Sequence, residues 1–259
     1  MSTPKIAQAF TNHKAFIPFI TCGDPNIETT EKLIVALEQA GADLIELGIP
    51  FSDPTAEGPV IQAANLRALS AGITTDKVFD MVARIRSQVS VPLVFMTYAN
   101  VVYGYGKKRF CQRAAEVGMS GLILPDVPFE EKYEFSETCR EHGLELVSLI
   151  APTSHDRVAA IAREAEGFVY CVSSLGVTGM RSEITTDVGA MVELVRQATD
   201  VPTAIGFGIS NPESAGAMAA KSDGAIVGSA IVKLIAEHGE DAVEPVSRFA
   251  RDLVTGIRG

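Results

Sequence analysis

The chain has 259 residues, of which 47% are hydrophobic and 21% charged, so it can bury a large core in one domain or in two. Its formal net charge of −10 argues against nucleic acid or an anionic membrane as a partner. No apolar stretch is long enough to cross a bilayer, and the first ten residues lack the apolar core of a signal peptide. These features predict a cytoplasmic protein.

The cysteines and histidines are scattered along the chain. Cys22, Cys111, Cys139 and Cys171 include no CxxC pair, and the four histidines form neither an HxH nor an HExxH pattern. We therefore expect reduced, mostly buried thiols and no metal site.

Short apolar runs rich in β-branched residues alternate with amphipathic segments from one end of the chain to the other. We predict eight strands, at residues 16–20, 43–47, 92–96, 121–125, 145–150, 168–172, 202–206 and 224–228. Helical patterns lie between them, and three end at a glycine just before the next strand, namely Gly41, Gly118 and Gly143. Three further helices are expected, at about residues 3–12, at about 61–71 and from about Ser229.

This alternation predicts a parallel sheet, and strands that are apolar nearly throughout indicate that helices cover both faces. Eight such strands without a linker favour an α/β fold, a single-domain (β/α)8 TIM barrel over residues 1–259. It would carry an extra N-terminal helix and additional short helices after strands two and eight. A doubly wound open sheet is the alternative, but the turn after the first strand reads TCGDPN instead of GxGxxG.

Two glutamates mark the second strand and the loop that follows it. Glu46 ends the strand, on the side of a barrel where catalytic groups lie. A carboxyl group there is costly to ionise unless it is paired, and a raised pKa suits a general acid. Glu57 lies in the Pro/Gly-rich loop that follows. Alternatively, Glu46 only hydrogen-bonds a neighbouring strand and Glu57 is a solvated loop residue.

Other polar residues occur at equivalent positions. Asp24 follows the first strand, Tyr98 and Asn100 follow the third, Asp126 follows the fourth, and Tyr170 lies within the sixth. Each has a structural interpretation as well, and Asp24 before Pro25 is typical of a turn or helix cap.

Three glycine-rich loops follow the last strands of the predicted barrel. They read SSLGVTG (173–179), GFGIS (206–210) and GSAIV (228–232). Glycines there, followed by a short helix, are typical of a phosphate site that backbone N–H groups form. Turn glycines without a ligand are the alternative. Since no lysine lies at a strand end to form an imine, the residues favour acid–base chemistry on a phosphorylated small molecule.

The segment ELGIPFSDPTAEGPVIQ (46–62) closely resembles a signature of the tryptophan synthase α-subunit family. PFITCGDP, MTYANVVYGYG, LILPDVP, GVTG, GFGIS and VGSAIVK follow in the order found in that family. The resemblance implies a (β/α)8 lyase that cleaves indole-3-glycerol phosphate to indole and glyceraldehyde 3-phosphate, with no cofactor or metal of its own. It also implies an α2β2 complex in which indole passes through a tunnel to a β subunit that holds pyridoxal phosphate.

The resemblance also implies roles for individual residues. Glu46 would be the catalytic acid and base, Glu57 the second acid, which holds the indole N–H, and Tyr170 an active-site tyrosine. Residues expected to bind substrate are Phe19, Ile61, Tyr98, Thr178 and Phe207. Those expected to bind phosphate are Gly179, Gly208, Gly228 and Ser229, and those expected to meet the β subunit are Asp53, Pro54 and Asn100.

Two positions depart from the family pattern. Glu57 replaces the usual Asp and is one methylene longer, and Thr55 replaces an aliphatic residue. Two alternative functions remain open at this point. One is a stand-alone lyase that releases free indole, and the other is a catalytically weak barrel that activates a β subunit.

Overall fold

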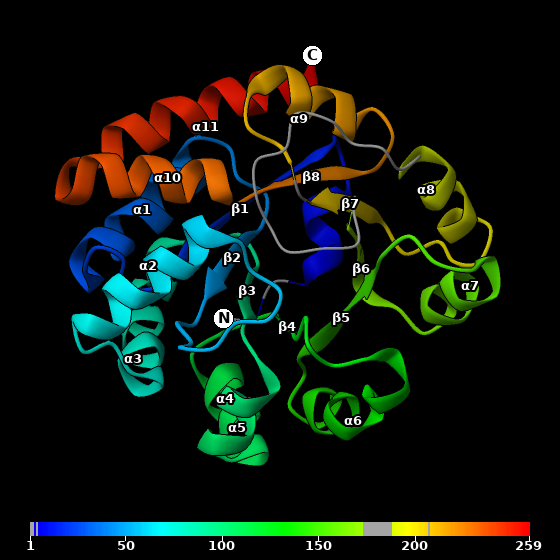
Figure 1. Cartoon of the computed structure of the whole chain (residues 1–259), viewed down its shortest axis with the longest axis horizontal. Helices are drawn as coiled ribbons and strands as arrows, with labels where there is room; N and C mark the ends of the chain where they lie inside the picture. Colours follow the sequence, from blue (N-terminus) through cyan, green and yellow to red (C-terminus); the bar gives the residue numbers. More distant parts are fainter. Residues whose placement is uncertain (1–2, 4, 173–187, 207) are drawn as a thin grey trace.

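Eight parallel strands close into a barrel that helices surround (Figure 1). This computed structural model describes residues 3, 5–172, 188–206 and 208–259. The strands pair in chain order and β8 pairs with β1. The (β/α)8 prediction is therefore confirmed, and the doubly wound alternative is wrong. The strands are β1 (Ala15–Thr21), β2 (Ile45–Gly48), β3 (Leu93–Met96), β4 (Gly121–Ile123), β5 (Glu145–Ile150), β6 (Glu166–Val172), β7 (Thr203–Gly206) and β8 (Gly224–Val227).

The connections between strands are mostly helical, and some contain two helices. One helix follows each of β1 and β4 to β7, namely α1 (Ile27–Gln39), α6 (Tyr133–Glu141), α7 (His155–Arg163), α8 (Val188–Arg196) and α9 (Pro212–Ala219). Pairs follow the remaining strands: α2 (Pro59–Ser70) with α3 (Thr75–Ile85), α4 (Ala99–Tyr105) with α5 (Lys107–Glu116), and α10 (Ser229–His238) with α11 (Val243–Arg258). The extra helices predicted after β2 and β8 are confirmed, whereas α4 was not predicted.

Local sequence explains where several helices begin and end. Asn26 caps α1 by accepting a hydrogen bond of 2.8 Å from Thr29 N, and Asn211 forms a capping box with Ser214 at α9. The three glycines predicted to end helices all have positive φ. Gly118 must be a glycine for two reasons. Its φ is 84°, which other residues rarely adopt, and an added Cβ would lie 2.9 Å from the Arg86 side chain.

A short 3₁₀ helix, η1 (Ile6–Phe10), closes the N-terminal end of the barrel. Ile6 is fully buried, and its N–H donates to Glu145 Oε2 at 3.1 Å. The helix is shorter than the predicted segment of about residues 3–12, because residues 11–14 already form the bend that leads into β1. Further 3₁₀ turns are η2 (Arg86–Gln88), η3 (Phe129–Glu131) and η4 (Gly239–Asp241).

Buried side chains form two clusters, one inside the barrel and one between the strands and the helices. The inner cluster includes Ile17, Phe19, Val94, Phe168 and Tyr170. Side chains one residue further along each strand, such as Ile20 and Phe95, belong to the outer cluster. Alternate strand residues therefore line the barrel interior, and Glu46 shares this inward direction with Leu44.

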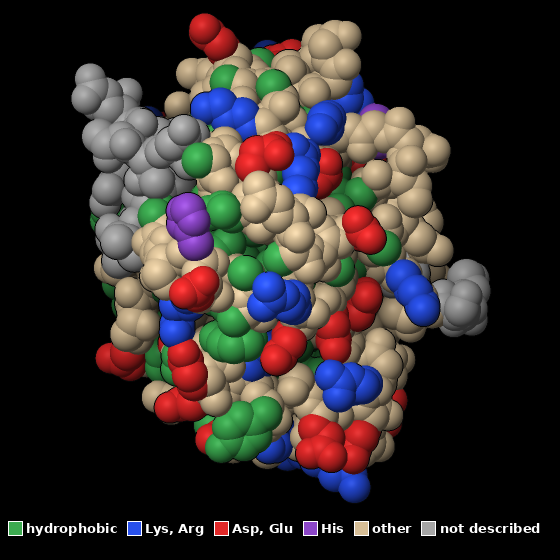
Figure 2. All heavy atoms as spheres, turned by 90° about the vertical axis from the view of Figure 1, so that its right-hand side faces the viewer, with side chains coloured by type: hydrophobic (Ala, Val, Ile, Leu, Met, Phe, Trp, Pro, Cys, Tyr) green, Lys and Arg blue, Asp and Glu red, His purple; other side chains and the backbone are tan. Residues whose placement is uncertain are grey.

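The surface carries acidic and basic side chains interspersed, as the face with α7 and α8 shows (Figure 2). Among the described residues, no helix is long and apolar enough to cross a membrane. All four cysteines are buried, as predicted.

Candidate active site

Glu46 is the second of the four residues of β2, so the prediction that it ends the strand is wrong, because the strand continues to Gly48. Glu46 pairs in register with Phe19 of β1 and Val94 of β3, and its side chain is completely buried. Neither carboxylate oxygen has a hydrogen-bond partner among the described residues. Burial raises the pKa of this carboxyl to about 8. Glu46 is therefore poised to hold a proton near neutral pH. The alternative in which it only bonds a neighbouring strand finds no support, because the described residues of β1 and β3 form no such bond with it.

Glu57 lies at the end of the loop after β2, just before α2 begins. Only 5% of it is exposed, so it is not a solvated loop residue. Its Oε2 accepts a hydrogen bond of 2.6 Å from Asn65 Nδ2 of α2. Burial raises the pKa of Glu57 to about 7, although the bond from Asn65 favours the charged form and opposes that rise. The pKa of Glu57 is thus about 7 and that of Glu46 about 8.

Tyr170 is buried in β6, among the side chains that fill the barrel. Burial, and secondly the negative charge of Glu46, raise the pKa of its phenol well above the usual 10. Tyr170 belongs to the inner cluster, and Glu46 also points into the barrel. Gly206 of β7 leaves room for the ring, because a Cβ there would lie 2.5 Å from the Tyr170 hydroxyl.

A cavity of about 400 Å³ is lined by Tyr170 together with residues of β3, β5 and α7, whereas neither Glu46 nor Glu57 lines it. Its inner wall is mostly apolar, which suits an aromatic ring. Tyr170 lines this cavity, and the charge of Glu46 contributes to the raised pKa of its phenol. Other inner lining residues are Ala56, Met96, Leu124, Leu149 and Val172.

Two of the four predicted phosphate positions lie at the start of α10. Gly228 precedes this helix and Ser229 is its first residue, and both are half-buried. No side chain of a described residue caps α10, whose first internal hydrogen bond runs from Val232 N to Gly228 O at 3.0 Å. The N–H groups before Val232 have the arrangement that binds anions at helix N-termini. Gly208 follows β7 with φ of 76°.

The structure brings several other predicted residues to the same end of the barrel. Phe19 and Ile61 are buried in the inner cluster. Tyr98 is also buried, but its hydroxyl accepts a hydrogen bond of 3.2 Å from Ala56 N and its ring packs on Phe51, so it holds the loop after β2. Three predicted residues lie outside the described residues, namely Thr178, Gly179 and Phe207.

The residues expected to meet a partner lie on the outside of this end. Asp53 and Asn100 are exposed, and Pro54 is half-buried. Thr55, the departure from the family pattern, is exposed as well, so its hydroxyl group is not buried.

Asp24 and Asp126 have structural partners. Arg67 forms an ion pair with Asp24, and Ala99 N at the start of α4 donates to Asp126 at 3.1 Å. Within the described residues, no group of three or more His, Cys, Asp or Glu side chains is arranged to hold a metal ion.

Sequence analysis missed three residues that shape the site. Asn65 contacts the Glu57 carboxylate, Gly206 leaves room for Tyr170, and Gly48 leaves room for Phe19, whose ring would lie 2.6 Å from an added Cβ. One signal was available for Asn65, because it is a polar residue on the otherwise apolar face that Ile61 and Ala68 define at helical spacing.

Comparison with known proteins agrees with this geometry. The family model described as tryptophan synthase alpha chain matches residues 6–255. The chain is 48% identical over 257 residues to the tryptophan synthase alpha chain of Lacticaseibacillus casei, covering 99% of this chain and 97% of that protein. It is 52% identical over 250 residues to the one from Lactiplantibacillus plantarum, covering 96% and 93%.

Solved structures are equally similar. A structure from Aquifex aeolicus VF5 has a TM-score of 0.90 at 33% identity and covers 100% of both chains. A chain of the tryptophan synthase complex from Pyrococcus furiosus has a TM-score of 0.86 at 35% identity, covering 94% of this chain and 99% of that one. The chain belongs to the tryptophan synthase alpha chain family, the lyases that use carboxylates to cleave indole-3-glycerol phosphate to indole and glyceraldehyde 3-phosphate.

Proposed function

We propose that Glu46 and Glu57 carry out this cleavage in the present chain, with Tyr170 beside them. The observation that supports the proposal most is the buried Glu46 carboxyl in β2, which has no hydrogen-bond partner among the described residues and a pKa of about 8. A carboxyl group in this state can both donate and accept a proton near neutral pH. Glu57, with the lower pKa of about 7, is the group that is more readily an anion.

The proton transfers in this proposal balance. Protonated Glu46 donates its proton to C3 of the indole ring, and the ring nitrogen becomes positively charged. Ionised Glu57 accepts a hydrogen bond from the ring N–H and stabilises that charge. Glu46, now a carboxylate, takes the proton of the glycerol hydroxyl next to the ring. The carbon–carbon bond then breaks, its electron pair returns to the ring, and Glu46 is again protonated.

The rest of the site binds the substrate. Phe19 and Ile61 of the inner cluster, with Tyr98 and Phe207, would surround the indole. The first turn of α10 at Gly228 and Ser229 would hold the phosphate. Thr178, Gly179 and Gly208 are assigned to the same pocket from the sequence.

The proposal includes a β subunit as partner. Structures similar to this chain include tryptophan synthase complexes from Mycobacterium tuberculosis and Pyrococcus furiosus. We place the contact at Asp53, Pro54 and Asn100, in an α2β2 assembly that channels indole. Cleavage needs no cofactor in this chain, and pyridoxal phosphate belongs to the β partner. Four buried free thiols favour a cytoplasmic location.

Indole release from indole-3-glycerol phosphate tests the assignment of Glu46. Glu46→Gln keeps the size of the side chain but removes the transferable proton, so we expect a loss of at least about 10³-fold in kcat. Binding of a phosphate-containing substrate analogue should persist. As a matched control, Glu31→Gln changes a half-buried glutamate of α1 that is paired with Arg84, and it should retain full activity. Cleavage by Glu46→Gln at the original rate would refute the proposal.

A further inference from the structure

The Glu57 carboxylate contacts α2, the helix that follows its own loop. Asn65 Nδ2 donates a hydrogen bond of 2.6 Å to Glu57 Oε2, and both residues are buried. Among the residues that the structure describes, this is the one hydrogen bond that the carboxylate accepts. We infer that Asn65 is a positioning residue, which holds one oxygen of Glu57 and leaves Oε1 for the ring N–H of the substrate. The inference rests on the role proposed above for Glu57.

The position of Asn65 is itself fixed by the packing of α2. Asn65 lies on the buried face of the helix with Ala64 and Ala68. Two residues further along, Arg67 binds Asp24 with two hydrogen bonds of 2.8 Å, from Nε to Oδ1 and from Nη2 to Oδ2. Only 1% of Asp24 is exposed, so the helix is tied to a buried point in the loop after β1. A bidentate pair fixes orientation as well as distance.

The chemistry of an amide suits this task. The NH2 group of Asn65 only donates hydrogen bonds, so it favours the ionised form of Glu57 over the protonated form. The proposed role requires that ionised form. Glu57 also has one more rotatable bond than the Asp usual at this position, and a fixed donor limits the additional freedom of the longer side chain.

Two other titratable groups have to be considered beside Glu57, the phenol of Tyr98 and the carboxyl of Glu46. Burial, and secondly the charge of Glu57, raise the pKa of Tyr98, which precedes α4, so this phenol remains neutral. Asp24 and Arg67 form an ion pair with each other. Glu46 of β2 titrates at about 8 and is required in its protonated form, so it governs the alkaline limb of activity. The acid limb therefore belongs to Glu57.

The pH dependence of kcat/KM tests the inference. Asn65→Leu removes the donor and leaves the carboxylate buried, so the pKa of Glu57 rises. We expect the acid limb of kcat/KM to move to higher pH by about one unit, which is about a tenfold loss at pH values below the limb. The alkaline limb should remain in place, since Glu46 is not in contact with Asn65. Glu57→Ala should remove the acid limb altogether, and adding Asn65→Leu to it should cause no further change.

Gln62→Leu is the matched control. Gln62 Nε2 donates to the backbone oxygen of Glu57 at 2.6 Å, so this variant removes a bond to the same residue without touching its carboxylate. Its acid limb should stay where it is. If Asn65→Leu does not fold, as judged by circular dichroism, Asn65→Asp supplies the same test with a side chain of nearly the same size. Two facing carboxyl groups should move the limb further still.

The outcomes separate this inference from the function proposed for Glu57. An unchanged acid limb in both folded Asn65 variants, with kcat/KM of Glu57→Ala strongly lowered and without an acid limb, would overturn the positioning role alone. A fall in kcat/KM that is equal at all pH values would also overturn it, because that result describes a merely structural residue. Full activity in Glu57→Ala would instead overturn the role of Glu57.

Discussion

Glu46 is a buried carboxyl group without a hydrogen-bond partner among the described residues. Such a group is costly to ionise, and folding therefore favours its protonated form. Strongly shifted pKa values of this kind gather at functional sites, where the shift is part of the chemistry. The same feature has a consequence for stability, which can be measured without substrate.

We predict that the stability conferred by Glu46→Gln grows with pH. Below pH of about 4.5, the usual pKa of a glutamate, Glu46 is protonated in both the folded and the unfolded chain. Between about 4.5 and 8 the unfolded chain releases this proton while the folded chain retains it, so the wild-type protein loses stability as pH rises. The loss is on the order of 4 kcal/mol at pH 8.

Urea unfolding at pH 5 and at pH 8 measures this difference. The free energy of unfolding of Glu46→Gln minus that of wild type should be small at pH 5 and several times larger at pH 8. Glu31→Gln, at the ion pair with Arg84, should show no such trend. A difference that is the same at both pH values would mean that Glu46 is already ionised in the folded protein.

The sequence was enough to predict the direction of Glu46 but not the contact made by Asn65, and the difference has a physical reason. The inward direction of Glu46 was predictable because side chains alternate between the two faces of a strand, although Glu46 lies within β2 and not at its end. The bond between Asn65 and Glu57 was not, because it depends on the path of the loop before α2. Asp24 was ambiguous for the same reason, since its partner Arg67 is 43 residues away.

At the scale of elements, glycines in two strands leave room for large side chains of the neighbouring strands. Tyr170 of β6 pairs in register with Ala204 of β7, and its ring extends over Gly206, two residues further along β7. The ring fits there because Gly206 has no side chain. Phe19 of β1 likewise occupies the space beside Gly48 of β2. Glycine at a strand end can thus serve packing as well as the phosphate-binding turns that the sequence pattern indicated.

We predict that Gly206→Ala lowers kcat/KM by on the order of 10²-fold, because a displacement of about 1 Å in an active site has that effect. The new Cβ would lie 2.5 Å from the Tyr170 ring and hydroxyl, so the tyrosine must move. Indole release measures the loss. Gly104→Ala is the control, since nothing lies within 4 Å of its Cβ, and it should retain wild-type kcat/KM. Equal activity in the two variants would show that the position of Tyr170 is unimportant for cleavage.

The prediction of elements succeeded where patterns were long and failed at local exceptions. β2 begins at Ile45 and not at residue 43, because Asp43 turns its carboxylate to Phe16 N and Arg258, at 2.8 Å each. The helix α4 was missed because its sequence, ANVVYGY, contains two valines and a glycine, which have low helix propensity. Tertiary packing, with Val102 fully buried, outweighs that propensity.

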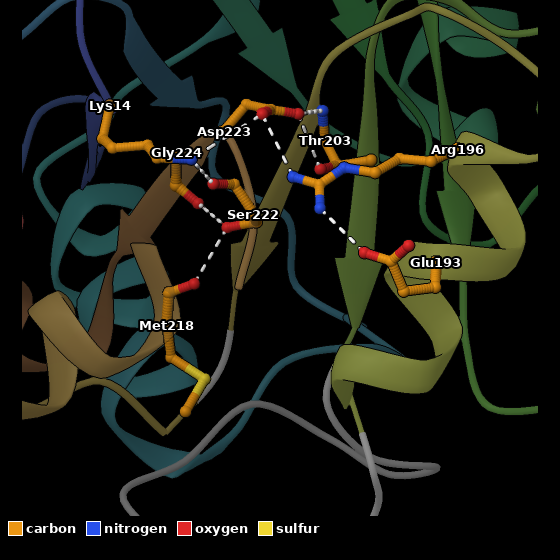
Figure 3. Close-up of polar contacts among 8 residues, drawn as sticks. All are labelled: Lys14, Glu193, Arg196, Thr203, Met218, Ser222, Asp223 and Gly224. Carbon is orange, nitrogen blue, oxygen red and sulfur yellow. Dashed lines mark hydrogen bonds and ion pairs between the residues drawn. The ribbon is translucent and has the colours of Figure 1, made fainter. Parts of the chain in front are cut away.

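For the whole molecule, the two ends of the barrel have different tasks. At the N-terminal end, Asp223 accepts hydrogen bonds of 2.9 Å from both the N–H and the hydroxyl of Thr203, and forms ion pairs with Arg196 and Lys14 (Figure 3). Burial opposes ionisation of Asp223, but these partners outweigh it and hold its pKa below the usual value. Charges at this end are paired, whereas Glu46 and Glu57 near the other end have raised pKa values. This division is typical of TIM barrel enzymes, in which stability and catalysis lie at opposite faces.

The catalytic end also carries the predicted contact with a β subunit, so partner binding and cleavage should be coupled. The loop that holds Glu57 exposes Asp53, and Tyr98 ties the same loop to the segment that leads to Asn100. A partner that orders this loop reduces the entropy lost when Glu57 is brought to the substrate. We therefore predict slow indole release by the purified chain and release at least about tenfold faster with a β subunit present.

The ratio of the two rates is the quantity to measure. Asp53→Ala should reduce this ratio, whereas Asp80→Ala, at an exposed position on α3, should leave it unchanged. Fast release by the chain alone, with no gain from the partner, would instead identify a stand-alone lyase. Acceleration of the partner's own reaction by a Glu46→Gln chain, with wild-type indole release absent under both conditions, would identify an activator without catalysis. The loop between β2 and α2 decides among these outcomes, because it joins the surface proposed to meet the partner to the buried carboxylate of Glu57.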